Sequence, residues 1–281
     1  MYLEEVENCL LFNNSLSHNG AGIILNGAES NILYNNLAYL NYYDGIDVFG
    51  GKDNILYENG AMKNSLGVYI ENSTNNTLIN NTAELNEFDG IDLIGSDRNI
   101  IYGNHVFKNE LGIYSEASDG NYLYNNTVNI NYWGGIELLN SNDSILFGNK
   151  IQKNDIGIYQ EASTNNTFVN NNLELNYGGI ALYASDGNVL YLNNFNNEIN
   201  AEDDNKNTWN TTEGNYWSDY TGEDSDGNGI GDTPYIINET SGSADFRPLM
   251  EPVVYSDFFV PSKVSLSIKQ LDLPEAAALE N

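Results

Sequence analysis

The sequence predicts an all-β protein: a right-handed single-stranded parallel β-helix with an irregular C-terminal cap. A 45-residue repeat that divides into halves of 23 and 22 residues, and apolar and Asn columns that keep their places within each half, predict this fold. A fixed short period indicates stacked structural units. Copies at 31–75, 76–120 and 121–165, with half-units at 9–30, 166–187 and 188–210, predict nine turns over residues 9–210.

The strongest apolar column follows a glycine in each turn. Glycine permits a corner that other residues resist, and a β-branched residue after it favours a strand. The column consists of Ile23, Ile46, Val68, Ile91, Ile113, Ile136, Ile158 and Ile180. Two further apolar columns give three short strands per turn and leave no stretch suited to a helix. Because parallel crossover connections are almost always right-handed, we expect a right-handed rod about 43 Å long.

Two columns of Asn support the same fold. One contains Asn81 and Asn104, and the other contains Asn86 and Asn109. Asn tolerates left-handed corners, and its amide can bond to an identical neighbour along the stack. The alternative, a disordered Asn-rich tract, would not keep apolar residues in register.

Composition excludes several classes of partner. Forty acidic against ten basic residues give a formal net charge of −30. Nucleic acid and anionic membrane surfaces are therefore poor direct partners. No apolar run reaches the 18 residues of a membrane span, and the single Cys9 excludes an intrachain disulfide framework. Residues 1–8 lack a signal-peptide pattern and are expected to form an incomplete first turn. We expect a monomer.

Acidic and aromatic residues alternate on the outward side of the strands that follow the glycines. Two positions after each glycine the column reads Ile24, Asp47, Tyr69, Asp92, Tyr114, Glu137, Tyr159 and Ala181. The three tyrosines lie two turns apart, about 9.6 Å, which suits a linear glycan. Tyrosine rings would stack on sugars while Asp47, Asp92 and Glu137 accept hydroxyl hydrogen bonds. The alternative is a solvated surface on which alternation only avoids repulsion between like charges.

The same acids also suit an enzyme. Asp44 with Asp47, and Asp89 with Asp92, flank the glycine in two copies, and carboxylates about 5–9 Å apart serve in glycoside hydrolysis. Asp47, Asp92 and Glu137 are therefore the candidate catalytic residues of a hydrolase, lyase or epimerase acting on polysaccharide. A face that repeats, rather than one singular cluster, favours instead a non-catalytic scaffold or adhesin that binds glycans.

Residues 224–232, D-S-D-G-N-G-I-G-D, carry the spacing of a calcium loop. The candidate ligands are the side chains of Asp224, Asp226, Asn228 and Asp232 and the carbonyl oxygen of Ile230. The twelfth position is Tyr235 instead of the usual Glu, so the last ligand must come from elsewhere or from water. The alternative is a metal-free turn. We predict that Ca²⁺ binds this loop and stabilises the cap.

Three short motifs beyond the repeat are more specific than the repeat itself. They are G-N-Y-W-S-D-Y at 214–220, D-T-P-Y-I-I at 232–237 and D-F-R-P-L-M at 245–250. With the repeat, they resemble the NosD-like parallel β-helix family over residues 8–252, and archaeal secreted and cell-surface members in particular. The resemblance implies a β-helix, an extracellular or cell-surface location and calcium use.

The named member of that family is an accessory factor in copper delivery to nitrous oxide reductase. Two His, one Cys and three Met form no soft-ligand cluster in this sequence, so the resemblance does not extend to copper.

We expect three segments: a β-helix at 1–210, a cap with the calcium loop at 211–252, and a tail at 253–281. Residues 198–213 are polar and predict a loop. The tail would be a strand on the rod or the start of a further module, and Ala276–Glu280 resembles a cloning scar. The predicted function is a secreted or cell-surface, calcium-stabilised scaffold or adhesin that binds polysaccharide. The alternative is a polysaccharide-acting enzyme.

Overall fold

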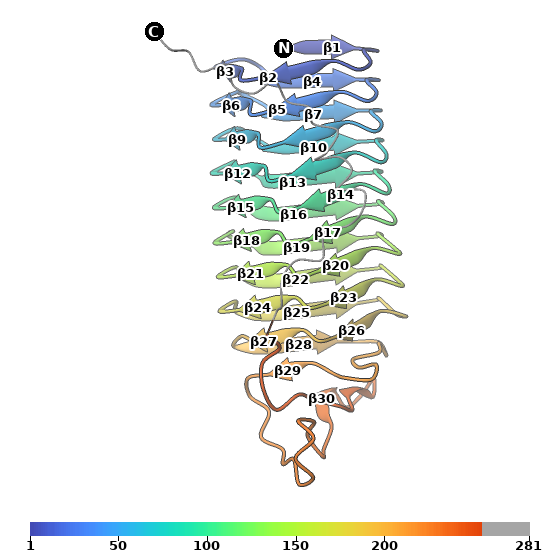
Figure 1. The fold of residues 1–281 in the computed structure, drawn as a ribbon. Coiled ribbons are helices and arrows are strands. Elements are labelled where there is room, and N and C mark those ends of the chain that lie inside the picture. Colours follow the sequence, from blue (N-terminus) through green and yellow to red (C-terminus); the bar gives the residue numbers. More distant parts are fainter. Residues whose placement is uncertain (255–281) are drawn as a thin grey trace.

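Each turn of the chain folds into three short strands, and the turns stack into a parallel solenoid (Figure 1). The computed structural model describes residues 1–254, a range that contains no α-helix and so none that could cross a membrane. The rest of the predicted tail, with Ala276–Glu280, lies outside the described residues. The sequence therefore predicted the fold class and the number of strands per turn correctly.

Three parallel sheets run the length of the solenoid, and equivalent strands of successive turns are hydrogen-bonded neighbours. The first sheet contains β1 (Tyr2–Glu4), β4 (Ile23–Asn26), β7 (Ile46–Phe49), β10 (Val68–Glu71), β13 (Asp89–Ile94), β16 (Leu111–Glu116), β19 (Gly134–Leu139), β22 (Ile156–Glu161), β25 (Gly178–Tyr183) and β28 (Ile199–Asp203). The second contains β2 (Leu10–Phe12), β5 (Ile32–Tyr34), β8 (Ile55–Tyr57), β11 (Thr77–Ile79), β14 (Ile100–Tyr102), β17 (Tyr122–Tyr124), β20 (Ile145–Phe147), β23 (Thr167–Val169) and β26 (Val189–Tyr191). The third contains β3 (Ser15–Ser17), β6 (Leu37–Tyr39), β9 (Gly60–Met62), β12 (Thr82–Glu84), β15 (His105–Phe107), β18 (Thr127–Asn129), β21 (Lys150–Gln152), β24 (Asn172–Glu174), β27 (Asn194–Asn196) and β29 (Tyr216–Trp217). In the cap, β30 (Tyr235–Asn238) pairs antiparallel with β31 (Ser243–Asp245).

The solenoid has about ten turns, so the prediction of nine turns over residues 9–210 was short. At the N-terminal end, β1 pairs with β4, so residues 1–8 belong to a further turn of the solenoid. At the C-terminal end, β28 lies inside the segment 198–213 that was expected to be a loop, and it pairs with β25. An end strand takes its backbone hydrogen bonds from the coil before it whatever its side chains are, so polar composition was a poor guide there.

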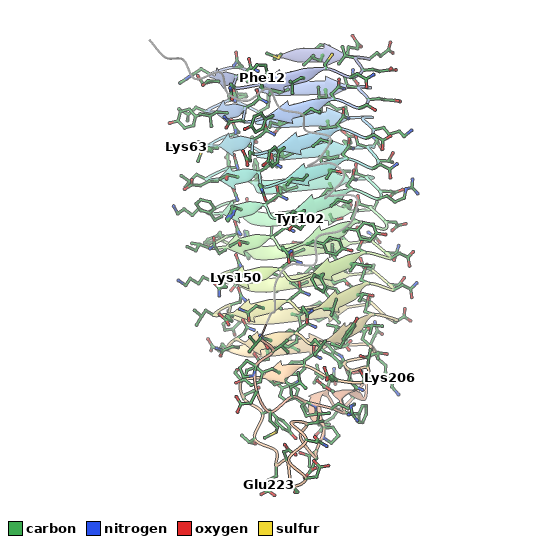
Figure 2. The ribbon with its side chains drawn as sticks, in the orientation of Figure 1. Phe12, Lys63, Tyr102, Lys150, Lys206 and Glu223 are labelled. Carbon is green, nitrogen blue, oxygen red and sulfur yellow. The ribbon has the colours of Figure 1, made fainter. Side chains whose placement is uncertain are left out.

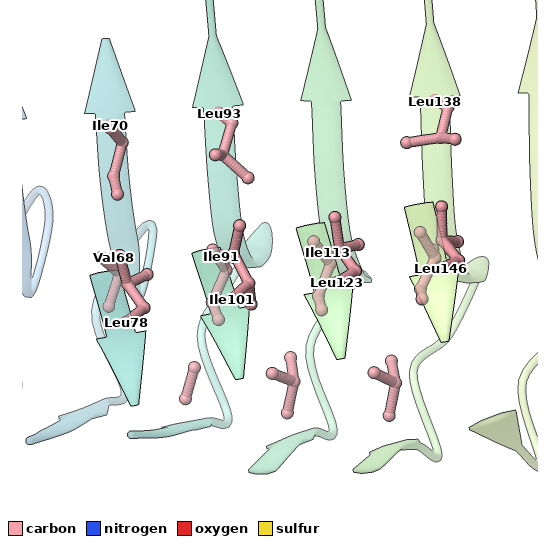
Figure 3. Packing of buried hydrophobic residues seen from close by; sticks show 14 of the residues in the cluster. Val68, Ile70, Leu78, Ile91, Leu93, Ile101, Ile113, Leu123, Leu138 and Leu146 are labelled. Atoms are coloured by element: carbon pink, nitrogen blue, oxygen red, sulfur yellow. The ribbon is translucent and has the colours of Figure 1, made fainter. Parts of the chain in front are cut away.

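The column that follows the glycines lies inside the solenoid, as predicted. Ile46, Ile91 and Ile136 are completely buried. Val68 joins Ile46 to Ile91 in register, and Ile113 joins Ile91 to Ile136. Figure 3 shows this column beside the apolar column of the second sheet. The result is one continuous apolar interior, in which each coil buries the face of the next.

Close packing requires the glycine before each of these residues. A Cβ atom added to Gly90 would lie 2.3 Å from Val106 Cγ1 and 2.8 Å from Asn109 Nδ2. Gly90 is not among the residues with positive φ. The prediction that glycine is needed there for an unusual corner therefore had the right residue and the wrong reason.

Asn side chains form ladders along the stack, and the two predicted columns are confirmed. Asn104 Nδ2 donates to Asn126 Oδ1 (3.0 Å) and to the carbonyl oxygen of Leu78 (3.1 Å). Its Oδ1 accepts from the backbone N–H (2.8 Å) and Nδ2 (3.0 Å) of Asn81. A third ladder, which the sequence reasoning missed, runs through Asn31, Asn54, Asn76, Asn99 and Asn121 before Ser144 interrupts it.

Aromatic residues of the cap close the C-terminal end of the core. Trp217 stacks between Phe195 (centroids 4.5 Å apart) and Tyr235 (4.1 Å). Its Nε1 donates to Asp245 Oδ2 (3.0 Å). An end of a repeat stack needs such a cover because its last apolar layer has no further coil to pack against.

Candidate functional site

The alternating residues predicted on the outward face form one column, which we call the acid–tyrosine column. In order along the first sheet it consists of Asp47, Tyr69, Asp92, Tyr114, Glu137 and Tyr159. Each member pairs in register with the next. Ile91 and Leu93 point inside on either side of Asp92, so Asp92 faces outward. The structure thus brings all six predicted polysaccharide-binding residues together.

Two acids of the column are buried, although they face outward. Asp47 is 3% exposed and Asp92 is 7% exposed. Neither Asp47 Oδ1 nor Asp92 Oδ1 has a hydrogen-bond partner. A buried carboxyl oxygen without a donor is costly, and a native structure that keeps one calls for an explanation. Burial therefore argues against the alternative of a simple solvated surface at these two positions.

Burial also changes the acidity of these groups. It raises the pKa of Asp92 to about 8, with the negative charge of Asp89 as the second cause. The pKa of Asp47 rises to about 8 for the same reason, helped by the charge of Asp44 and a hydrogen bond with it. Burial likewise raises the pKa of Asp89 to about 7, ahead of the charges of Glu137 and Glu110. Acids that can hold a proton near neutral pH are typical of functional sites.

The tyrosines of the column are fixed by the next outward-facing residue of their own strands. Their hydroxyl groups donate to glutamates two positions further on, in the pairs Tyr69–Glu71 (3.1 Å), Tyr114–Glu116 (3.0 Å) and Tyr159–Glu161 (2.8 Å). Each ring therefore leans along its strand. Burial, and then the neighbouring glutamate, raise the pKa of Tyr69 and Tyr114, so these hydroxyls keep their protons. Asp92 lies between two such rings.

A set of exposed aromatic side chains flanks the column where every second turn enters the first sheet. We call it the aromatic ridge, and it consists of Tyr42, Tyr43, Phe88, Tyr132, Trp133 and Tyr177. The sequence reasoning missed these residues. One signal in the sequence could have indicated them. The 23-residue half-repeats have an extra residue before the glycine, which lengthens this corner in alternate turns.

The ridge and the column meet in a hollow of about 300 Å³ beside β16, β19 and β22. Its lining consists of Glu110, Leu111, Trp133, Gly134, Glu137, Asp155, Ile156, Tyr159 and Glu161. Trp133 Nε1 donates to Glu110 Oε1 (2.8 Å), which fixes the indole at the rim. The hollow thus combines four carboxyl groups with two aromatic rings, and no basic side chain lines it.

Lysines that recur with the repeat lie at the outer corners, and Lys108 and Lys153 line a second hollow that shares Asp155 with this one. Lys63, Lys108 and Lys153 all have positive φ, like Leu40 and the other apolar residues at the same corner of alternate turns. Figure 2 shows Lys63 extending from the edge of the third sheet. The Lys108 ammonium is paired with Glu84 (3.1 Å). All three are exposed charges at the edge of the third sheet.

The predicted calcium loop lies at the tip of the cap, next to Glu223 (Figure 2). The Asp224 carboxylate accepts hydrogen bonds from the N–H groups of Gly229 (2.8 Å), Asn228 (3.1 Å) and Gly227 (2.8 Å), which lower its pKa. Within residues 1–254, no three His, Cys, Asp or Glu side chains are grouped to hold a metal. The loop thus has the hydrogen bonds of a turn, and calcium binding remains a prediction.

Two family models match parts of the chain. The model described as periplasmic copper-binding protein (NosD) matches residues 87–222, and that of the right handed beta helix region matches residues 1–128. The chain is similar to NosD and to right-handed β-helices. The second match agrees with the predicted handedness. No curated protein matches the chain.

Several solved structures share the fold. A double mutant of the periplasmic alginate epimerase AlgG is 19% identical with a TM-score of 0.60, over 75% of this chain and 57% of AlgG. The A-module of the Azotobacter vinelandii mannuronan C-5 epimerase AlgE6 is 14% identical with a TM-score of 0.58, over 75% and 67% of the two chains. Tailspike protein 2 of an Escherichia coli bacteriophage is 13% identical with a TM-score of 0.56, over 69% and 34%. At such identities the likeness concerns the fold alone.

Proposed function

We propose that the acid–tyrosine column and the aromatic ridge bind a linear polysaccharide. The observation that carries this proposal is Asp92, whose buried Oδ1 has no partner between the rings of Tyr69 and Tyr114. A sugar hydroxyl both donates and accepts, so it satisfies this carboxyl in either protonation state. The apolar face of a sugar ring packs on the tyrosines beside it. One buried acid and the two tyrosine rings beside it therefore form one binding position for a sugar residue.

The contact repeats along the stack. Asp47, Asp92 and Glu137 follow one another every two turns, about 9.6 Å by strand spacing, which is close to the length of a disaccharide. An extended glycan that runs along the rod meets the same contact several times. Weak contacts on one chain combine through effective concentration, so affinity should increase steeply with the length of the glycan.

Tyr114→Ala tests this proposal. It removes the ring between Asp92 and Glu137, and we expect it to weaken the binding of an octasaccharide severalfold while the protein stays folded. The matched control is Tyr102→Ala, which removes a half-buried tyrosine from the second sheet. Calorimetric titration with a disaccharide and an octasaccharide measures both effects. Affinity that is absent, or the same for both lengths, refutes the proposal.

We also propose an extracytoplasmic location, where polysaccharides of this kind occur. NosD and AlgG are both described as periplasmic. In its simplest form the protein is then a secreted or cell-surface scaffold or adhesin.

A second candidate function is polysaccharide hydrolysis, favoured by one observation. Asp92 holds a proton near neutral pH, and Glu137 lies two strands away across Tyr114. This spacing, about 9.6 Å between backbones, is near that of inverting glycosidases. A lyase or an epimerase acting on uronates would instead need a partner for the substrate carboxylate, and no basic side chain lines the hollow.

In this reaction the Asp92 carboxyl gives its proton to the glycosidic oxygen as the bond to the anomeric carbon breaks. Glu137 takes a proton from the water that attacks the same carbon from the opposite side, so one water is consumed per bond. Asp92→Asn should abolish the release of reducing ends and leave binding of the product measurable. A polysaccharide panel that shows no turnover with the wild-type chain excludes this candidate.

For the cap, we propose that Ca²⁺ binds Asp224, Asp226, Asn228, Asp232 and the carbonyl oxygen of Ile230. The proposal is supported by the spacing of these oxygen ligands and by a net charge of −30, which any bound cation relieves. Calorimetry on the chelated protein should show calcium binding that Asp226→Ala abolishes. A melting temperature indifferent to calcium would leave residues 224–232 as a turn.

A further inference from the structure

The surroundings of Asp92 contain acids without any cation to neutralise them. The charges that raise its pKa belong to Asp89, Glu116, Asp44 and Glu71, after burial as the main cause. Within residues 1–254, two ion pairs occur, Lys52–Asp53 and Lys108–Glu84, and neither belongs to the acid–tyrosine column. No cation in the described part of the chain pairs with these acids, so an ammonium group that binds Asp92 would take the place of the proton that Asp92 holds near neutral pH.

Three classes of glycan would meet these acids differently. A uronate polymer brings further carboxylates beside buried acids, and repulsion opposes its binding. A neutral polymer supplies hydroxyl donors and leaves the charge uncompensated. An amino sugar with a free ammonium group supplies three N–H donors together with a positive charge, and charge-assisted hydrogen bonds are about twice as strong as neutral ones. The unpartnered Asp92 Oδ1 is the acceptor that such a group would find.

The aromatic rings favour the same class. Tyr69 and Tyr114 lie on either side of Asp92, and Trp133 stands at the rim of the hollow next to Glu137. Cations are attracted to the faces of such rings, most strongly to Trp, whereas anions are repelled by them. Sugar packing and ammonium binding therefore both favour the same residues.

Resting on the proposed polysaccharide binding, we infer that the polymer is cationic, a glucosamine-type chain whose free ammonium groups bind Asp47, Asp92 and Glu137. The spacing supports this inference. In an extended chain with alternating ring orientation, every second amino group points to the same side, and these acids recur every two strands, about 9.6 Å. The inference differs from what the names of AlgG and AlgE6 suggest for those proteins, since alginate is a polymer of uronic acids.

The test compares four hexasaccharides by calorimetric titration of the full chain at low salt, at a pH at which the sugar amine is charged. They are a β-1,4-linked glucosamine hexamer, its N-acetylated counterpart, a cellulose-type hexamer and a mannuronate hexamer. We expect the glucosamine hexamer to bind at least about tenfold more tightly than the N-acetylated one, because acetylation removes the charge and keeps the ring. Asp92→Asn should lose about tenfold toward the glucosamine hexamer and little toward the N-acetylated one.

A matched control separates a site from general attraction between a polycation and an acidic protein. Asp186→Asn makes the same substitution in an exposed turn between β25 and β26, and it should leave the binding of the glucosamine hexamer unchanged. Equal losses in the two variants, or tighter binding of any of the other hexamers, overturn the inference while polysaccharide binding stands. If no hexasaccharide binds, both the inference and the proposed function fail.

Discussion

The acidity of Asp92 makes a prediction about stability that needs no ligand. Its pKa rises from 3.8 to about 8 on folding, mainly through burial. Between these values the folded protein keeps a proton that the unfolded chain has released. The free energy of unfolding therefore falls as pH rises through this window. The contribution of the Asp92 proton to stability is fully present only below the pKa of the unfolded chain, and it is lost as pH rises to the pKa of the folded protein. Asp92→Asn removes the titrating group and should remove its share of this pH dependence.

The expected magnitude follows from the window. One proton held by the folded state alone changes the free energy of unfolding by about 1.4 kcal/mol per pH unit. From about pH 5 to about pH 8, Asp92 therefore costs the wild type about 4 kcal/mol, as an upper value because water that reaches the carboxylate screens its charge. Any pH-independent effect of the new amide cancels when the two pH values are compared.

Urea unfolding of the wild type and of Asp92→Asn at both ends of this pH range measures the difference. The variant should gain stability relative to the wild type as pH rises, whereas Asp186→Asn, at an exposed position, should follow the wild type. Parallel stability curves for the wild type and Asp92→Asn would refute the reasoning. They would mean that Asp92 is solvated or has a donor in solution.

Two further predictions concern the stack itself. Ile91→Asp should unfold the protein or fray it at β13, because it places an unpaired charge in a completely buried column, and loss of the cooperative transition in circular dichroism would report this. Asn104→Ala should cost about 3–5 kcal/mol in urea unfolding, since the buried backbone N–H of Asn81 loses its acceptor and the side chains of Asn81 and Asn126 each lose one hydrogen bond. A cost below about 1 kcal/mol would mean that the ladders contribute little to stability.

The sequence by itself determined the architecture. The repeat period of a solenoid sequence reflects its structure, because each turn packs on its neighbours through the same few positions. The column through Ile46, Ile91 and Ile136 was therefore readable as the interior, and the alternation of acids and tyrosines as one outward face. The ends of the stack were not readable in this way. At the C-terminal end, β28 pairs with β25 and Trp217 stacks on Phe195 of the preceding turn, and the repeat pattern of the sequence is lost.

Only the tertiary structure decided what the outward face is like. Strand alternation says that Asp92 points out, and it says nothing of how far the tyrosines of the adjoining coils and the acids around them cover it. Burial, the unpartnered Oδ1 and the raised pKa all result from neighbours that are distant in sequence. The hollow beside Trp133 arises in the same way, from residues of successive coils brought together at one corner. A repeat fixes which residues share a face, whereas solvent access depends on the volumes of all the side chains packed around them.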